Sequence, residues 1–425
     1  MSAAEVKLWG KTIGAVYVDD RSPYAYFRYE DSFIKSGIQV SPIRMPLSRE
    51  IYQFNTLPLE SFHGLPGLLS DSLPDRYGNQ IIQAWLKAQG RPLDSLNSVE
   101  RLCYVGQRGM GALEYHPAQS FGSDTISNIE LNQLVDVSNA IIHAKKDVKV
   151  NIKDDLKTII KVGTSAGGAR AKAITAYNEK TGAIQSGQID TGPDFTHWLI
   201  KLDGIDQADN ASFTRREYAY YLMAKTAGIQ MNESRLLKKD GFYHFMTKRF
   251  DRVTHEDGRT EKKHMQTLGA LTHTDYNEPG LMSYEQVTNI MYQMGLKLSE
   301  NKEFFRQLVF NVMARNLDDH VKNISFLMDK KGIWTLAPAY DVTYAYNPLG
   351  RWTSQHQMRI QGKTEHITYE DLTEAAKSMN LKVSDAKSII QEVQKALHHW
   401  EKFASDAELK DEEIATIKSQ FILFE

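Results

Sequence analysis

Cysteine is almost absent from the sequence, and Cys103 is the single thiol among 425 residues. One thiol cannot form an intramolecular disulfide, so the small disulfide-stapled secreted folds are excluded and a reducing compartment is expected. No apolar run approaches the ~20 residues that a transmembrane helix needs, and the first residues, MSAAEVKLWGKTIG, lack the apolar segment of a signal peptide. We therefore expect a soluble cytoplasmic protein.

An excess of charge of one sign is also missing. The chain has 51 Lys plus Arg against 53 Asp plus Glu, for a formal net charge of −2. A protein that binds nucleic acid by itself usually has a basic excess, so we expect any DNA contact to be local or made through a partner. The 41% of hydrophobic and 24% of charged residues are typical of a folded globular protein.

The beginning of the chain is predicted to be rich in β-structure. Residues with a preference for strands over 6–8, 16–18 and 24–29 indicate a β-meander. A helix is expected over 74–88, where the apolar residues share one face and Pro74 fits the first helical position. The polar stretch 117–127 is typical of a linker and predicts the first domain boundary.

The length of 425 residues predicts about three structural units, at about 150 residues each. We expect a β-rich module over residues 1–122, an α/β lobe over 123–254 and a helical lobe over 255–425. The third unit should consist almost wholly of helices, because apolar residues recur there at helical spacing. This order of units predicts an α+β fold.

A glycine-rich segment, VGTSAGGARAKA, covers residues 162–173. Gly163, Gly167 and Gly168, with small residues between them, allow successive backbone N–H groups to face one point, which favours an anion. The segment matches neither the Walker pattern nor GxGxxG, and a tight surface turn would explain it equally well. Two predicted strands follow it, so the loop should lie at the mouth of a sheet.

The next strand, HWLIKL, contains Lys201 among apolar residues. This lysine is either an edge-strand residue that faces water or a charge held for an anionic ligand, and the strand alone favours the first interpretation. A helix is predicted over 212–228, with Glu217 near its beginning. Glu217 either pairs with Lys201 or favours the helix dipole, and the second is the more ordinary explanation.

A strand predicted over 243–250 leads into the sequence Arg249-Phe250-Asp251-Arg252. This segment fits a crossover between two lobes, where backbone groups would bind adenine and Asp251 would bind a ribose hydroxyl. A charged strand end is the alternative.

The segment NLDDHVKN, residues 316–323, carries the most specific pattern. Asp318 and Asn323 have the D-x4-N spacing of kinase catalytic loops, in which the aspartate accepts the proton of the substrate hydroxyl and the asparagine holds magnesium. A predicted hairpin over 324–336 then leads to a second acid, Asp341. The spacing is common by chance and helix capping would also explain Asp318, but the glycine loop, lysine strand and two acids in this order predict a phosphotransferase.

Phosphoryl transfer depends on positioning and on neutralisation of charge. In this interpretation Lys201 steadies the phosphates of ATP, Asn323 and Asp341 bind Mg²⁺, and Asp318 orients the attacking hydroxyl.

Two more residues of the loop are candidates. Lys322 would neutralise the transferring phosphoryl group, or it is a solvated surface charge. His320 is assigned to the nucleotide-binding set as a hydrogen bonder that fixes the loop rather than as a base, because Asp318 already occupies that position.

Several segments together resemble the HipA family of bacterial toxin serine/threonine kinases over nearly the whole chain. They are GLLSDSLPDRYGN, GMGALEY, GTSAGGARAKA, HWLIKLDG, KRFDR, DDHVKN and LAPAYDV. The resemblance implies a two-lobed, protein-kinase-like fold with an extra N-terminal β-rich module and a helical C-terminal lobe. It also implies a small DNA-binding antitoxin, HipB, whose complex with the toxin represses their shared operon.

The resemblance assigns the same roles to Asp318, Asn323, Asp341 and Lys201 as the residue chemistry does. It also implies that the segment from Lys248 through Phe250 to Asp251 meets adenine and ribose. Position 248 is a departure, because a lysine stands where a relative has a glutamate.

Ser165 in the glycine loop matches the serine that members of the family autophosphorylate. Two added negative charges in a phosphate cradle would repel the nucleotide, which would make the toxin self-limiting. A turn serine that bonds to its own backbone is the alternative.

The resemblance further implies a target in translation, such as glutamyl-tRNA synthetase, and a role in growth arrest and persistence. Two other functions stay open. One is a small-molecule phosphotransferase with the same D-x4-N pattern, against which the phosphorylatable serine argues. The other is a non-catalytic, ATP-responsive co-repressor that bridges antitoxin dimers on DNA, against which the complete set of proposed catalytic residues argues.

Overall fold

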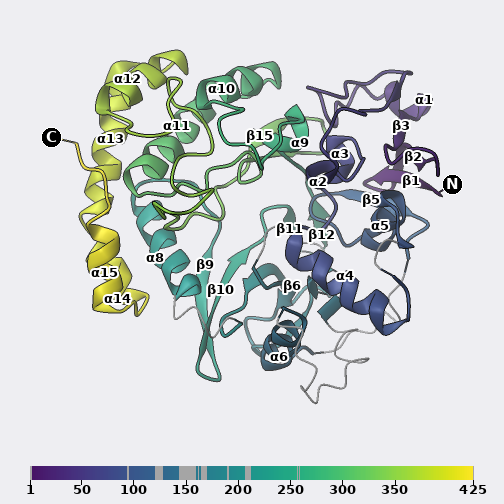
Figure 1. Ribbon diagram of the computed structural model, residues 1–425, viewed down its shortest axis with the longest axis horizontal. Helices are drawn as coiled ribbons and strands as arrows, with labels where there is room; N and C mark the ends of the chain where they lie inside the picture. The colour runs from purple at the N-terminus through teal and green to yellow at the C-terminus, as the bar shows by residue number, and fades with distance from the viewer. Residues whose placement is uncertain are drawn as a thin grey trace.

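The structure is a computed structural model, and it describes residues 2–92, 95–119, 128–142, 159–160, 162–163, 170–188, 191–205, 212–255, 257 and 259–424. The N-terminal module and the helical C-terminal part lie on opposite sides of the molecule in Figure 1, and an α/β lobe lies below and between them. Within the described ranges, no helix is long and apolar enough to cross a membrane.

The N-terminal module is built on a five-stranded antiparallel sheet in the order β4-β3-β2-β1-β5, which confirms the predicted β-meander. Its strands are β1 (Ser2–Leu8), β2 (Lys11–Val18), β3 (Tyr26–Tyr29), β4 (Ile51–Tyr52) and β5 (Leu113–His116). Alternate residues of β1, namely Ala4, Val6 and Leu8, are buried, as expected for a sheet with one face on the core. The helices of this part are α1 (Asp31–Ile34), α2 (Leu59–Phe62), α3 (Gly67–Ser70), α4 (Arg76–Ala88) and α5 (Ser98–Val105).

The α/β lobe contains a second five-stranded antiparallel sheet, in the order β7-β6-β8-β10-β9. Its strands are β6 (Lys172–Tyr177), β7 (Ile184–Ser186), β8 (Thr196–Lys201), β9 (Ser234–Lys239) and β10 (Phe242–Lys248). The lobe also has helices α6 (Leu131–Ile142) and α8 (Phe213–Thr226) and the short ribbon β11 (Arg252–Thr254) and β12 (Thr260–Lys262). Because β8 lies between β6 and β10, the edge-strand interpretation of Lys201 is wrong.

The C-terminal part is mainly helical but also contains a three-stranded sheet, of which the sequence predicted only the hairpin over 324–336. Its helices are α9 (Leu268–Thr272), α10 (Tyr284–Gln293), α11 (Leu298–Met313), α12 (Tyr369–Ser378), α13 (Val383–Leu397), α14 (Trp400–Asp406) and α15 (Asp411–Lys418). The sheet consists of β13 (His264–Thr267), β14 (Ser325–Met328) and β15 (Trp334–Leu336) in that order. The predicted hairpin is confirmed as β14 and β15, and residues 314–324 connect α11 to it.

Hydrophobic packing crosses the boundaries at residues 122 and 254 that the sequence predicts. One apolar cluster continues from the sheet of the N-terminal module through α8 to the C-terminal helices. A second cluster joins Tyr77 and Ile81 of α4 to Trp198 of β8, so α4 packs on the α/β lobe.

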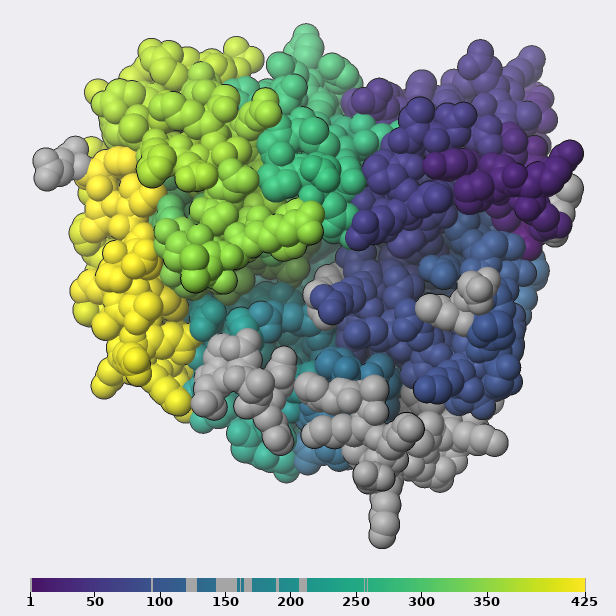
Figure 2. All heavy atoms as spheres, viewed as in Figure 1, coloured from purple at the N-terminus to yellow at the C-terminus, as the bar shows by residue number. Residues whose placement is uncertain are grey.

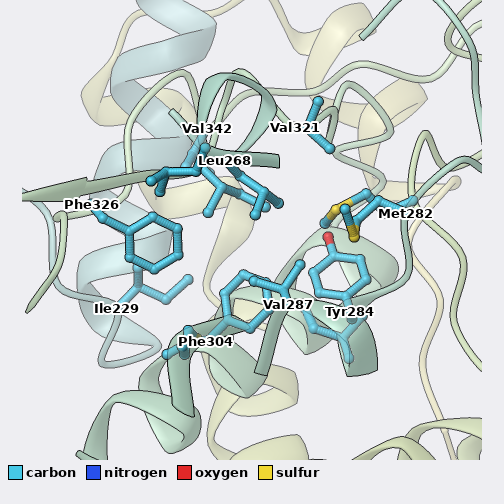
Figure 3. Packing of buried hydrophobic residues seen from close by; sticks show 14 of the residues in the cluster. Ile229, Leu268, Met282, Tyr284, Val287, Phe304, Val321, Phe326 and Val342 are labelled. Atoms are coloured by element: carbon cyan, nitrogen blue, oxygen red, sulfur yellow. The ribbon is translucent and has the colours of Figure 1, made fainter. Parts of the chain in front are cut away.

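The first cluster also supports the segment that connects α11 to β14. Figure 3 shows Phe304, Phe326, Leu268 and Val321 directed toward the same interior. Val321 lies within the predicted catalytic loop and is 4% exposed, so one side chain of the loop is anchored in the core.

His264 on β13 joins the C-terminal sheet to the N-terminal module. Its ring is buried, its Nε2 donates a hydrogen bond to the carbonyl of Val40 at 3.0 Å, and its Nδ1 has no hydrogen-bond partner among the residues that the structure describes. Burial lowers the pKa of His264 to about 4. The same cause lowers the pKa of His197, His244 and His273 to about 4.

We predict that these histidines make the protein less stable in weak acid. In the unfolded chain the pKa of a histidine is about 6.5, so between pH 6.5 and 4 the unfolded state binds more protons and the free energy of unfolding falls as pH falls. His264→Gln, which keeps an N–H donor, should reduce this slope by up to about 1.4 kcal/mol per pH unit. Urea unfolding at several pH values measures the slope. The exposed His366→Gln serves as the control, and an unchanged slope in His264→Gln would contradict the prediction.

Candidate active site

Lys201 lies at the C-terminal end of β8 and is shared by two carboxylates. Its Nζ donates hydrogen bonds to both carboxylate oxygens of Glu217 on α8, at 2.7 and 2.8 Å. The same Nζ donates to Oδ1 of Asp341 at 2.7 Å. Of the two explanations for Glu217, the structure therefore shows the ion pair with Lys201, and the preference for the helix dipole is wrong.

The charges of this cluster are stabilised by one another. The side chains of Lys201 and Glu217 are 10% and 9% exposed, and that of Asp341 is 36% exposed. Burial acts to lower the pKa of Lys201, but Asp341 and Glu217 outweigh it and raise that pKa above its usual range. Burial acts to raise the pKa of Asp341, but Lys201 and Lys172 outweigh it and lower that pKa to about 2. At neutral pH Lys201 is therefore a cation and Asp341 an anion.

Asp341 has a backbone φ of 54°, in the left-handed region that a residue with a side chain rarely adopts. The preceding Tyr340 is held by two hydrogen bonds of its hydroxyl, with Ser325 Oγ at 2.6 Å and with the carbonyl of Lys322 at 2.7 Å. Strained residues of this kind occur often at functional sites, where the surrounding structure holds them.

The predicted catalytic loop closes on itself through Asn323. The side-chain Nδ2 of Asn323 donates to the carbonyl of Asp318 at 2.7 Å. The carboxylate of Asp318 is 46% exposed and lies 3.7 Å from Nε2 of His320. Asp318, Asn323 and Asp341 line one cleft, so the structure brings the three residues together. The cleft is also lined by Ile229, Tyr284, Phe304, Gln307, Asn311, Asn316, Asp319, Ile324, Ala339, Tyr340 and Val342.

Lys322 and His320 both fix the loop. Nδ1 of His320 accepts a hydrogen bond from the backbone N–H of Lys322 at 3.3 Å, in keeping with a role as a hydrogen bonder. The ammonium group of Lys322 donates to Oδ1 of Asp75 at 2.5 Å, so it is not a solvated surface charge.

The carboxylate of Asp251 is not in the cleft. It is completely buried, and it accepts hydrogen bonds from Arg249 at 2.8 and 2.6 Å, from Arg252 at 2.7 Å and from the backbone N–H of Gly111 at 2.7 Å. The structure therefore does not support the predicted ribose contact of this side chain. Instead Asp251 attaches the crossover segment to the N-terminal module.

Lys248 and Phe250, the two other residues of this segment that were predicted to meet the nucleotide, lie nearer the surface than Asp251. Nζ of Lys248 is 4.0 Å from Glu233, and the Lys248 side chain is 43% exposed. The ring of Phe250 lies 5.6 Å from that of Tyr340, which lines the cleft. Phe250 therefore borders the cleft through a ring contact, while Lys248 pairs with a surface acid.

Of the glycine loop, Gly163 is described. A Cβ atom at this position would lie 2.5 Å from Cδ1 of Ile81 on α4, so close packing accounts for this glycine. Ser165, Gly167 and Gly168, three further residues predicted for the site, lie outside the described residues.

Lys172 on β6 is a residue that the sequence did not single out. It is 3% exposed and stands opposite Lys201 across the antiparallel pair. Burial lowers the pKa of Lys172, and Asp341 acts in the other direction. Its position beside Lys201 depends on the strand register, which the local pattern does not reveal.

Asp319, the second acid of the DD doublet, was also missed. Its carboxylate is 1% exposed and accepts hydrogen bonds from the hydroxyl of Tyr284 at 2.8 Å and the backbone N–H of Gln357 at 2.7 Å. Nδ1 of His356 lies 2.9 Å from it. Asp319 thus ties the predicted catalytic loop to the segment before α12. The sequence feature that could have indicated it is the pair of adjacent aspartates, Asp318 and Asp319.

The residues of the cleft fit a nucleotide-bound magnesium ion. Asn323 and Asp341 supply oxygen atoms, and magnesium in kinases is held by one or two such side chains together with substrate phosphates. Within the described part of the chain, no group of three His, Cys, Asp or Glu residues could hold a metal by itself. The ammonium group of Lys201, beside Asp341, would supply a cation for the phosphates of such a nucleotide.

Comparisons with known proteins cover nearly the whole chain. A family model described as the HipA-like C-terminal domain matches residues 164–400, and one described as the HipA N-terminal domain matches residues 4–116. A putative kinase of Haemophilus influenzae is 30% identical over 138 aligned residues, and the match covers 29% of this chain. The matched stretch spans 39% of that relative's length.

A solved structure has the same fold. It is the complex of HipA, HipB and operator DNA from the toxin–antitoxin system of Shewanella oneidensis MR-1, and one of its chains superposes with a TM-score of 0.70. The superposition covers 98% of this chain and 95% of that chain at 16% sequence identity. From the match of both family models and this likeness, the chain has a two-lobed, kinase-like α+β fold and belongs to the HipA family.

Proposed function

We propose that the protein is an ATP- and Mg²⁺-dependent serine/threonine protein kinase and the toxin of a toxin–antitoxin pair. The observation that carries this proposal is the sharing of the Lys201 ammonium by Glu217 and Asp341, with Asp341, Asp318 and Asn323 lining one cleft. Phosphoryl transfer needs this set of a cation for the phosphates, oxygen ligands for the metal and an acceptor for the hydroxyl proton.

Each residue would perform one step of the transfer. Glu217 holds Lys201 in place, and Lys201 binds the phosphates of ATP. Asp341 and Asn323 would hold magnesium, which when bound neutralises the charge of the phosphates. Asp318 lines the cleft and is 46% exposed, so a substrate hydroxyl can reach it. Its carboxylate would orient this hydroxyl and accept its proton.

The proposed protein substrate is a component of translation such as glutamyl-tRNA synthetase, whose phosphorylation would inhibit growth and promote persistence. The proposed partner is a HipB-type antitoxin dimer, with which the protein would act as co-repressor of its operon. Its net charge of −2 supports DNA contact mainly through the antitoxin, and the S. oneidensis complex contains HipA, HipB and operator DNA together.

We predict that Asp318→Ala lowers the rate of phosphoryl transfer by about 10²- to 10⁴-fold, because the hydroxyl proton loses its acceptor. Purified protein is incubated with Mg²⁺ and ATP, and phosphate incorporation is mapped by mass spectrometry. Asp136→Ala on the exposed side of α6 is the control and should retain the wild-type rate. Equal incorporation of phosphate in the wild type and in Asp318→Ala would contradict the proposed role of Asp318 as the proton acceptor.

Lys201→Met should weaken ATP binding by about tenfold or more, since a hydrogen bond to a charged group contributes about 1.5–3 kcal/mol. The substitution also leaves the buried Glu217 without its cation, so the melting temperature should fall. Calorimetric titration with ATP and thermal unfolding measure the two effects. Lys239→Met removes a lysine of the more exposed pair with Glu130 and should change neither quantity appreciably. Wild-type affinity in Lys201→Met would exclude the phosphate-binding role.

Autophosphorylation of Ser165 is proposed as a self-inactivating switch. Ser165→Glu should then reduce ATP affinity through charge repulsion, whereas Ser165→Ala should bind ATP normally and no longer accept phosphate at this position. Nucleotide titration of both variants, beside mass spectrometry of the wild type, tests this expectation. An unchanged titration in Ser165→Glu would leave Ser165 as an ordinary turn residue.

A further inference from the structure

An ion pair joins the N-terminal module to the catalytic loop. Oδ1 of Asp75 lies 2.5 Å from Nζ of Lys322, and the two side chains are only 20% and 21% exposed. The ammonium group of Lys322 also lies 4.6 Å from the centre of the Tyr276 ring, within the range of a cation–π contact. The hydroxyl of Tyr340 donates a hydrogen bond to the backbone carbonyl of Lys322. Both the backbone and the ammonium group of Lys322 are therefore held in place.

Asp75 makes this contact although it occupies the N-cap position of α4. An N-cap aspartate commonly accepts a hydrogen bond from the first turn of its own helix, which contributes about 1 kcal/mol. Asp75 makes no such side-chain hydrogen bond, and its carboxylate bonds instead to Lys322. The direction of this side chain therefore serves the long-range contact rather than the helix.

The segment that carries Asp75 is held against the end of β13 and against α9. Asp71 accepts hydrogen bonds from the backbone N–H and the hydroxyl of Thr267, at 2.6 and 2.8 Å. The backbone N–H of Gly67 donates to Nε2 of His273 at 3.0 Å, and a Cβ at Gly67 would lie 2.1 Å from the carbonyl oxygen of Ala270. Figure 2 shows the purple-to-blue N-terminal module in direct contact with the green part of the chain. Asp75 therefore follows a segment whose position is fixed by these contacts.

The charge of Asp75 also acts on residues of the proposed nucleotide site. Burial is the main influence on the pKa of Tyr340 and raises it, and Asp341 and Asp75 act in the same direction. Burial lowers the pKa of Lys172, which Asp341 and Asp75 oppose. Asp75 is therefore within electrostatic range of Tyr340, which lines the cleft, and of Lys172, which lies opposite Lys201.

We propose that Asp75 is a positioning residue for phosphoryl transfer, holding the ammonium group of Lys322 where it meets the transferring phosphoryl group. This inference rests on the proposed kinase function and deepens it. A lysine side chain has four rotatable bonds, and a charge that is held in place before reaction needs no reorganisation during it. An ammonium group has three N–H donors, and the bond to Asp75 uses one of them. The N-terminal module is then a working part of the catalytic centre.

The test compares the full-length wild type with Asp75→Asn, Asp75→Glu and Glu114→Gln. Asparagine is as good an N-cap as aspartate, so Asp75→Asn removes the charge without weakening α4. Glu114 is the matched control, because its 2.9 Å pair with Lys262 also joins the N-terminal module to the rest of the chain and is similarly buried. Two quantities are measured with Mg²⁺ and ATP: the rate constant of autophosphorylation at saturating ATP, and the ATP concentration at half the maximal rate.

Asp75→Asn should lower the rate constant by about 10- to 100-fold and leave the half-saturating ATP concentration unchanged, because a mispositioned group affects the transfer step. Asp75→Glu should restore most of the rate, and Glu114→Gln should match the wild type. In a Lys322→Met background, Asp75→Asn should cause no further loss, since both residues would act through one contact.

Wild-type rates in Asp75→Asn, an equal loss in the Lys322→Met background, or an effect on the half-saturating concentration alone would overturn the inference while the kinase function stands. A wild type that neither binds ATP nor incorporates phosphate would overturn both. The two failures are therefore distinguishable.

Discussion

One ammonium group organises the centre of this molecule. Lys201 is bound simultaneously by a carboxylate from α8 and by a carboxylate that follows the β14–β15 hairpin, so a single side chain links both lobes. Removing a cation from this position would leave buried negative charge in place, which is strongly unfavourable. The central position of β8 in its sheet, the packing of α8 and the left-handed backbone of Asp341 all serve this contact. The candidate active site is thus also a structural joint between the lobes.

The N-terminal module is attached to the rest of the chain at several separate points. Asp251, with its two arginines, binds the backbone of Gly111, His264 binds the backbone of residue 40, and the segment around residues 67–75 lies on α9. The apolar cluster that begins in the N-terminal sheet continues to the helices beyond α11 without interruption. These contacts make the module a support of the kinase-like part rather than a separate appendage.

The local pattern predicted several of the elements and three of the residues that line the cleft, Asp318, Asn323 and Asp341. The spacing of Asp318 and Asn323 is short and local, and the hairpin that follows it has clear turn residues, so both could be read from the sequence. The environment of Lys201 could not, because an apolar strand with one lysine looks the same at an edge and at the centre of a sheet. The contacts of Asp251 with Gly111 and of Asp75 with Lys322 could not be predicted for a related reason, because these partners lie 140 and 247 residues away in the chain. Long-range pairing decides what a charged residue does, and one sequence carries little information about it.

The burial of Asp251 has a consequence for how the chain can be divided. Its partner Arg252 also donates hydrogen bonds to the carbonyls of Gly109 and Gly111, at 3.1 and 2.9 Å. A fragment that began after residue 116 would retain the charged cluster but lose these backbone partners, and a buried arginine–carboxylate group would become exposed or unsatisfied. If relatives recombined after residue 116, Asp251 and Arg252 would meet a Gly109–Gly111 segment from a different protein, with which they had not evolved. The N-terminal and C-terminal parts of this protein are therefore expected to be inherited as one unit.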